Sequence, residues 1–203
     1  METATPVIPD LRLRLAAVVA IGLAVGALTS VGQTYLDGSL NAFVNSASAW
    51  LIAPLVVGSW MATRRGAVAA GLAACSLQLV GYYVTAALRG FSASQGILLF
   101  WFVCAIVGGP LFGAAGHLWR TGGPRVRGLG ATALPAAFLA EGLWVYLHEL
   151  HYRLTAALWI GIGLVLLLLP LRQVKERGWL ALTLACALAG EIVLSLVYRQ
   201  SFG

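Results

Sequence analysis

Two glutamates stand inside long apolar segments, where an ionisable side chain is costly to place. Glu141 lies at the midpoint of the apolar segment 131–150, and Glu191 lies slightly beyond the midpoint of segment 179–198. Gln78 occupies a comparable depth in segment 67–88. Ionisable groups at such positions usually pair with another group or mark a functional site. We therefore predict that these side chains either hydrogen-bond a neighbouring helix or face a central cavity, where a carboxylate could bind a solute or accept a proton.

The residues that follow Glu141 repeat at steps of three and four. Trp144, His148 and His151 would share one face of an α-helix with Glu141, so the spacing predicts a polar and aromatic stripe running outward from the membrane centre. His148, Glu149 and His151 resemble a zinc-protease helix, but that motif requires two histidines four residues apart. We predict no metal site and no catalytic residue. A metal-dependent intramembrane enzyme would need ligands from other helices.

A second polar region precedes segment 47–62 and ends in aromatic residues. Asn45 and Ser46 either cap the following helix or belong to a lid over a pocket. Aromatic rings hold planar or cationic solutes by stacking and cation–π attraction. The sequence therefore predicts an outward-facing pocket with Glu141 at its floor and with walls from Trp50, Tyr82, Tyr83, Trp144 and His148.

The elements that position these residues must be membrane helices. Hydrophobic residues make up 60% of the 203 residues, and charged residues only 10%, whereas soluble domains carry about 25% charged residues. This composition excludes a soluble enzyme, a disordered chain and a nucleic-acid-binding protein, despite the net charge of +6. We expect the basic residues instead to be unequally distributed between the two sides of a membrane.

A helix of about 20 residues crosses a bilayer core of roughly 30 Å. The chain contains seven segments that approach this length, so we predict an all-α polytopic bundle that forms a single transmembrane domain over residues 1–203. Turn-forming residues such as Asp37-Gly38 and Gly122-Gly123-Pro124 separate some of the segments. The predicted spans are residues 13–29, 47–62, 67–88, 97–119, 131–150, 155–169 and 179–198.

The basic residues give this topology a direction, because Lys and Arg concentrate on cytoplasmic loops. With a cytoplasmic N-terminus, three basic residues fall outside, namely Arg89, Arg153 and Arg199. Ten fall inside: Arg12, Arg14, Arg64, Arg65, Arg120, Arg125, Arg127, Arg172, Lys175 and Arg177. We predict a multi-pass protein of the cell inner (plasma) membrane with its C-terminus outside.

Small residues recur at helical spacing on two predicted spans. Ala16, Ala20 and Ala24 follow one another at four-residue steps, and such faces let helix backbones approach closely. They serve internal packing or dock a partner membrane protein. The set Gly109, Gly113 and Gly116 lies on one face of segment 97–119 in the same way.

Several short motifs resemble those of an uncharacterised family of small multi-span bacterial membrane proteins. They are NSxxxW (Asn45, Ser46, Trp50), Gly81-Tyr82-Tyr83, GPxFG (Gly109, Pro110, Phe112, Gly113) and Glu141-Gly142. A fainter likeness is to the substrate-binding S components of energy-coupling-factor transporters. Those are bundles of six spans with an AxxxA docking motif on the first helix, which Ala16 and Ala20 match. That likeness implies an outward-facing solute site and a partner ATPase.

Together these features favour a membrane protein that binds or transports a small planar or cationic solute, with no cofactor. The alternatives are a scaffold or assembly partner that docks through its small-residue helix faces, and the intramembrane enzyme described above. Lipid is the expected surrounding in each case.

Overall fold

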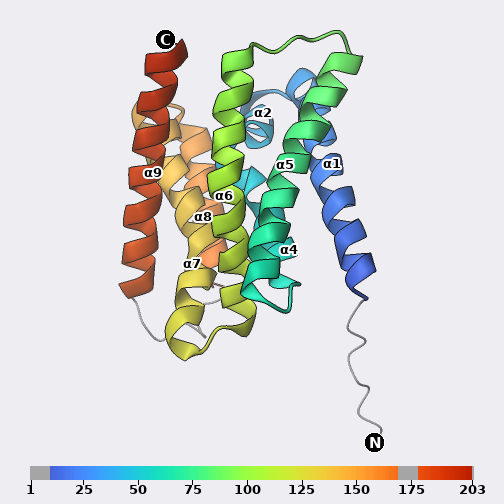
Figure 1. Cartoon of the computed structure of the whole chain (residues 1–203). Coiled ribbons are helices and arrows are strands. Elements are labelled where there is room, and N and C mark those ends of the chain that lie inside the picture. The colour runs from blue at the N-terminus through green and yellow to red at the C-terminus, as the bar shows by residue number, and fades with distance from the viewer. Residues whose placement is uncertain (1–9, 169–177, 203) are drawn as a thin grey trace, which may run out of the picture.

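The computed structural model describes residues 10–168 and 178–202 of the chain, and this part is helical, with no β-strand. Figure 1 shows the helices as a bundle whose long members run roughly side by side. In chain order they are α1 (Leu11–Tyr35), α2 (Gly38–Val44), α3 (Ala47–Trp50), α4 (Ile52–Ser59), α5 (Arg64–Leu88), α6 (Gln95–Thr121), α7 (Pro124–Glu141), the π-helix η1 (Gly142–Glu149), α8 (Arg153–Leu168) and α9 (Gly178–Phe202).

The all-α class is confirmed, and the chain is a multi-pass membrane protein. In the described residues five helices are long and apolar enough to cross a membrane: α1, α5, α6, α7 continued by η1, and α9. The pair Gly38–Val44 and Ala47–Ser59 is bent by 50° and makes a sixth span if it is counted as one. α8 is apolar but has only 16 residues. Seven spans therefore remain a prediction, as do the single domain and the placement of the termini.

The described chain begins and ends at opposite ends of the bundle. α1 begins at the lower end of the bundle in Figure 1 and α9 ends at the upper end. The basic loop residues Arg172, Lys175 and Arg177 lie outside the described residues. Which end of the bundle faces the cytoplasm stays a prediction.

Glycines set how closely the long helices approach. A Cβ atom at Gly71 of α5 would lie 2.1 Å from the carbonyl oxygen of Gly109 on α6, and one at Gly113 would lie 2.2 Å from that of Ala67. On the other side of α5, a Cβ at Gly26 of α1 would lie 1.9 Å from the Gln78 carbonyl oxygen. Only glycine permits such backbone contact. α5 is therefore clamped between α1 and α6, which places Gln78 in the interior.

The short helix α4 ends below this contact, and basic side chains from other helices bind its last carbonyl groups. Arg120 donates to the Ser59 oxygen at 3.1 Å, and Arg14 donates to the Trp60 oxygen. His117 Nδ1 lies 3.0 Å from the Met61 oxygen. The carbonyls at a helix C-terminus lack partners within the helix, and positive charge there is favourable. These contacts fix α4, and with it the α3 segment that reaches the candidate site.

Candidate functional site

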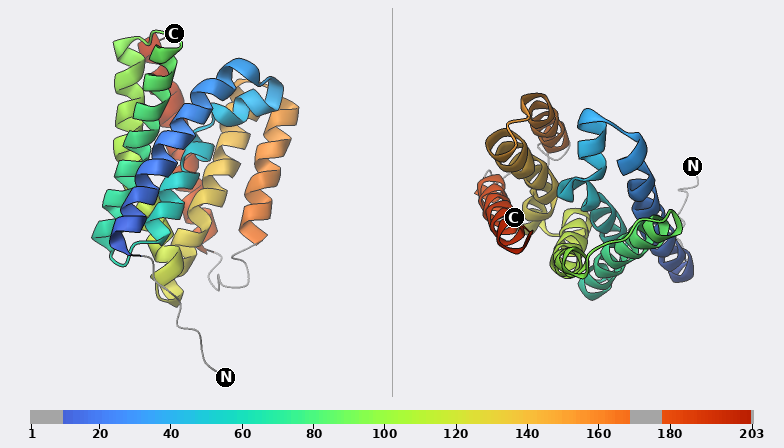
Figure 2. Two further views of the ribbon diagram at one scale, coloured as in Figure 1. Left: turned by 90° about the vertical axis from the view of Figure 1, so that its right-hand side faces the viewer. Right: turned by 90° about the horizontal axis from the view of Figure 1, so that it is seen from above.

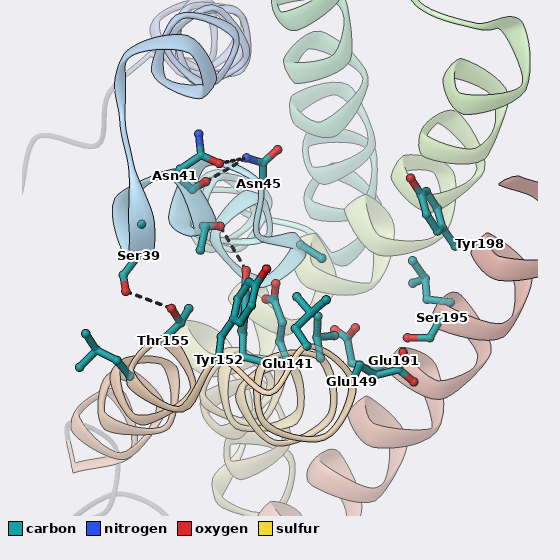
Figure 3. A pocket seen from close by; sticks show the side chains of 18 of the residues that line it. Ser39, Asn41, Asn45, Glu141, Glu149, Tyr152, Thr155, Glu191, Ser195 and Tyr198 are labelled. Carbon is teal, nitrogen blue, oxygen red and sulfur yellow. Dashed lines mark hydrogen bonds between the residues drawn. The ribbon is translucent and has the colours of Figure 1, made fainter. Parts of the chain in front are cut away.

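A cavity of about 930 Å³ lies in the half of the bundle that contains α2 and the C-terminal end of α9. Its walls come from α2, the start of α6, the end of α7 with η1, the start of α8, and α9. Figure 2 gives the view from above, in which α2 and α9 lie on different sides of the bundle. Figure 3 shows the acidic side chains Glu141, Glu149 and Glu191 along one side, with Asn41 and Asn45 opposite. The cavity therefore joins residues that are up to 161 positions apart in the chain, from Gly38 to Arg199.

Glu141 is the most buried acidic residue of the cavity, with 4% of its surface exposed. Its Oε2 atom accepts a hydrogen bond from Ser46 Oγ at 2.7 Å and from the Ser48 backbone N–H at 2.9 Å. Ser48 Oγ donates to the same oxygen. An oxygen that accepts three donors is an arrangement suited to an ionised carboxylate, which can only accept. The hydrogen bonds attach α3 to the end of α7 and fix where the carboxylate points.

A core of aromatic rings supports this network from behind. Trp159 on α8 is 1% exposed and donates its Nε1–H to Ser46 Oγ at 3.1 Å. The Trp159 ring packs against Tyr146 with centroids 4.7 Å apart and against Phe138 at 6.5 Å. Because Ser46 also caps α3 by accepting from the Ala49 N–H at 3.1 Å, one hydroxyl joins three elements. The predicted capping role of Ser46 is confirmed, whereas Asn45 is the C-terminal cap of α2.

Glu191 approaches the same cavity from α9, and it is partly buried. Within the described residues it has no hydrogen-bonded or ion-paired partner. Glu149 differs, because Arg199 of α9 forms an ion pair with it near the end of the helix. The cavity thus contains one carboxylate held by neutral donors, one paired with a cation, and one without a partner in this part of the chain.

Of the predicted stripe of Glu141, Trp144, His148 and His151, only Glu141 lines the cavity, and the cause lies in the backbone. Residues Gly142–Glu149 form a π-helix, in which hydrogen bonds span five residues instead of four, as in the 2.9 Å bond from the Leu150 N–H to the Val145 oxygen. Each turn then holds more residues than the 3.6 of an α-helix. The cavity face is accordingly formed by Glu141, Val145, Tyr146, Glu149 and Leu150.

Trp144 and His148 stack on each other beside the cavity, with ring centroids 4.6 Å apart, and neither residue lines it. His151 adopts a positive φ of 59° in the turn after η1, and its Nδ1 lies 3.2 Å from the Glu149 carbonyl oxygen. No group of three or more His, Cys, Asp or Glu side chains in the described ranges is placed to hold a metal ion. The arrangement brings acidic side chains to a cavity and leaves the histidines outside it.

The other predicted aromatic residues do not line the cavity, although Trp50 and Tyr83 pack against the same buried cluster as the cavity-wall residue Trp101. Tyr82 contacts both Trp50 and Tyr83, with centroids 6.2 and 5.0 Å apart, and these rings are not among the cavity walls. Gln78 is fully buried and donates to the Trp50 carbonyl oxygen at 3.1 Å, while its Oε1 has no partner in the described part of the chain. Gln78 therefore ties α5 to the end of α3 and does not line the cavity.

Asn45 lines the cavity and belongs to a polar network there. Its side-chain N–H group donates to the Asn41 side chain and backbone oxygens at 2.9 Å, and its Oδ1 accepts from Gln33. Ser39 of α2 lies 3.0 Å from the Thr155 hydroxyl of α8. The short helix α2, which Asn45 caps, thus forms one wall of the cavity.

Sequence reasoning missed every aromatic residue that lines the cavity. They are Phe100, Trp101, Tyr146, Tyr152 and Tyr198. The signal was present, since these residues lie near predicted span ends, but that position is equally typical of rings at a membrane interface. Only the tertiary structure distinguishes the two roles, because it brings Phe100 of α6, Tyr146 of η1 and Tyr198 of α9 to one cavity.

Residues 6–201 match the family of unknown function DUF6518. The chain belongs to the DUF6518 family. The resemblance to an uncharacterised membrane-protein family, drawn from motifs such as NSxxxW and Glu141-Gly142, is thereby confirmed. No curated protein and no solved structure matches the chain. The likeness to S components of energy-coupling-factor transporters therefore gains no support, and for this DUF6518 member the function has to be argued from the cavity.

Proposed function

We propose that this chain is an integral membrane protein that binds or transports a small solute in the cavity between α2, η1 and α9. The observation that carries the proposal is that Glu141 and Glu191, two acidic residues from different membrane helices, line one cavity. Its volume of about 930 Å³ falls in the usual range of ligand pockets, roughly 300–1,000 Å³. A purely structural role would explain the bonded Glu141, but it would not explain Glu191.

The rigidity of the site also favours binding. The Glu141 carboxylate is held by Ser46 and Ser48, and Trp159 holds Ser46 in turn. A binding group that is already oriented loses less freedom when a ligand arrives. A contact such as that of Trp159 with Ser46 keeps the residue that binds the carboxyl group in its position.

The proposal is tested by native mass spectrometry of the protein extracted from its own membranes in mild detergent. We expect a small-molecule adduct on the wild-type chain that is lost in Glu141→Gln and in Glu191→Gln. Asp37→Asn is the matched control, because Asp37 is an exposed carboxylate beside the cavity but not part of its walls. A wild-type chain without an adduct, or an adduct kept in both glutamine variants, would contradict the proposal.

A scaffold role is the second candidate, and one observation favours it. Gly22 and Gly26 of α1 face α5 and are buried, whereas Ala16, Ala20 and Ala24 are exposed on α1. These alanines therefore remain available to a partner helix. A photo-crosslinking residue at position 20, activated in native membranes, should give one discrete protein adduct if a partner docks there. Crosslinks to lipid alone would exclude this role.

A further inference from the structure

The charges that line the cavity are unequally distributed with depth. Arg199 is paired with Glu149, and the other basic residue of the walls, Arg153, is exposed at the first turn of α8. Glu141 and Glu191 lie among more buried surroundings. Within the described ranges, neither carboxylate forms an ion pair. The inner part of the cavity therefore carries acidic groups without a basic partner.

This charge distribution selects among solutes. Two acidic side chains that line one cavity without a basic partner repel an anion and attract a cation. A bare multivalent metal ion is a poor fit, because the described side chains provide no group of three metal ligands. Among charged solutes, the cavity therefore favours a cation with a larger, partly apolar body.

The aromatic walls match such a body. Phe100 contacts Trp101 and Tyr198 with ring centroids 5.2 and 5.6 Å apart, and all three residues line the cavity. Tyr146 follows Glu141 by one π-helical turn and lines the cavity with it. Aromatic faces attract ammonium groups and pack against apolar substituents. The wall between α6 and α9 is therefore suited to an organic cation.

We propose that the cavity takes an organic cation, either a protonated amine or a quaternary centre with an apolar body, whose charge is held by Glu141 and Glu191 while its body lies against Phe100, Trp101 and Tyr198. This proposal rests on the proposed function and specifies its substrate class. Glu141 is the fixed anchor, because three donors orient it. Glu191 has no such donor among the described residues, so the cation becomes its partner.

Two probes of equal shape and opposite charge test the substrate class. The protein is placed in nanodiscs of zwitterionic lipid, and binding of tetraphenylphosphonium and of tetraphenylborate is measured by equilibrium dialysis, with empty discs of the same lipid as background. We expect saturable binding of tetraphenylphosphonium alone. Glu191→Gln should weaken the binding of tetraphenylphosphonium by about tenfold or more, which corresponds to about 1.4 kcal/mol. Asp37→Asn should leave it unchanged.

Glu141→Gln should weaken binding as well, but Glu191→Gln is the decisive variant, because Glu191 supports no hydrogen bond in the described structure and its loss should not disturb folding. Equal binding of both probes, preference for tetraphenylborate, absence of binding, or full affinity in Glu191→Gln would overturn the cation proposal. The co-purified adduct then decides the proposed function separately, since an adduct that is neutral or anionic and depends on Glu141 would leave solute binding in place.

Discussion

Gly71→Ala tests whether glycine contact between α5 and α6 holds this bundle together. The added Cβ would lie 2.1 Å from the Gly109 carbonyl oxygen, where ordinary contact begins at 3.4 Å. The helices would have to separate locally by roughly 1.3 Å, because the obstacle is backbone and has no rotamer to change. Since α5 also packs on α1, that movement would spread to a second helix pair.

The expected cost follows from two opposing effects. Overpacking a close contact typically costs about 1–3 kcal/mol. Replacing a helical glycine by alanine returns about 0.5–1 kcal/mol, because alanine loses less backbone freedom on folding. Because a 2.1 Å contact with backbone belongs at the upper end of the overpacking cost, we expect the free energy of unfolding to fall by about 2 kcal/mol. Gly161→Ala on α8 is the matched control, since its Cβ would meet nothing within 4 Å, and its stability should stay the same or rise.

The measurement is a titration of the purified protein in mixed micelles with the denaturing detergent sodium dodecyl sulfate, followed by circular dichroism. Wild type, Gly71→Ala and Gly161→Ala are compared under identical conditions. A Gly71→Ala protein that unfolds at the same or higher detergent fraction than wild type would refute the packing argument. If both variants lost stability equally, the effect would belong to helix glycines in general and not to this contact.

Two further predictions concern the cavity. Ser48→Ala removes one donor to Glu141 and should lower the free energy of unfolding by about 1–3 kcal/mol in the same titration, because Ser48 is fully buried. Ser195 of α9 also lines the cavity but donates to no carboxylate in the described structure, so a loss no greater than that of Ser195→Ala would argue against the network. Arg199→Gln should change stability by less than about 1 kcal/mol, since the Arg199 side chain is 62% exposed. A double-mutant cycle with Glu149→Gln measures the coupling of that pair, and a coupling well above this value would show that the ion pair fixes α9.

Much of the molecule could be predicted because lipid imposes strict requirements on sequence. Apolar segments of about 20 residues predict membrane helices, since a helix satisfies each backbone polar group within the segment itself. The glycines of segment 97–119 were predicted to share a face, and Gly109, Gly113 and Gly116 are all buried in α6. Glu141 and Glu191 were recognised from their depth alone, and both line the cavity.

The walls around these glutamates could not be predicted in the same way. The assignment of Trp144 and His148 to the site assumed an α-helical period after Glu141. The residue types from Gly142 to Glu149 do not indicate the i→i+5 hydrogen bonding that this segment adopts. Trp50, Tyr82 and Tyr83 were grouped with them because they share a depth. Residues at the same depth in the membrane can face different sides of the bundle, so depth alone does not show which side chains meet.

The sequence by itself determined the class of the protein, the family, and the depth of its two buried acidic residues, because hydropathy and periodicity are properties of each segment alone. Only the tertiary structure decided which side chains meet. The π-helical turn directs Glu149 toward Arg199 of α9 and Tyr146 toward α2 and α8, and the close approach of α5 to α6 and α1 removes Gln78 from the cavity. Such contacts depend on how whole helices rotate and pack against one another, and no single segment contains that information.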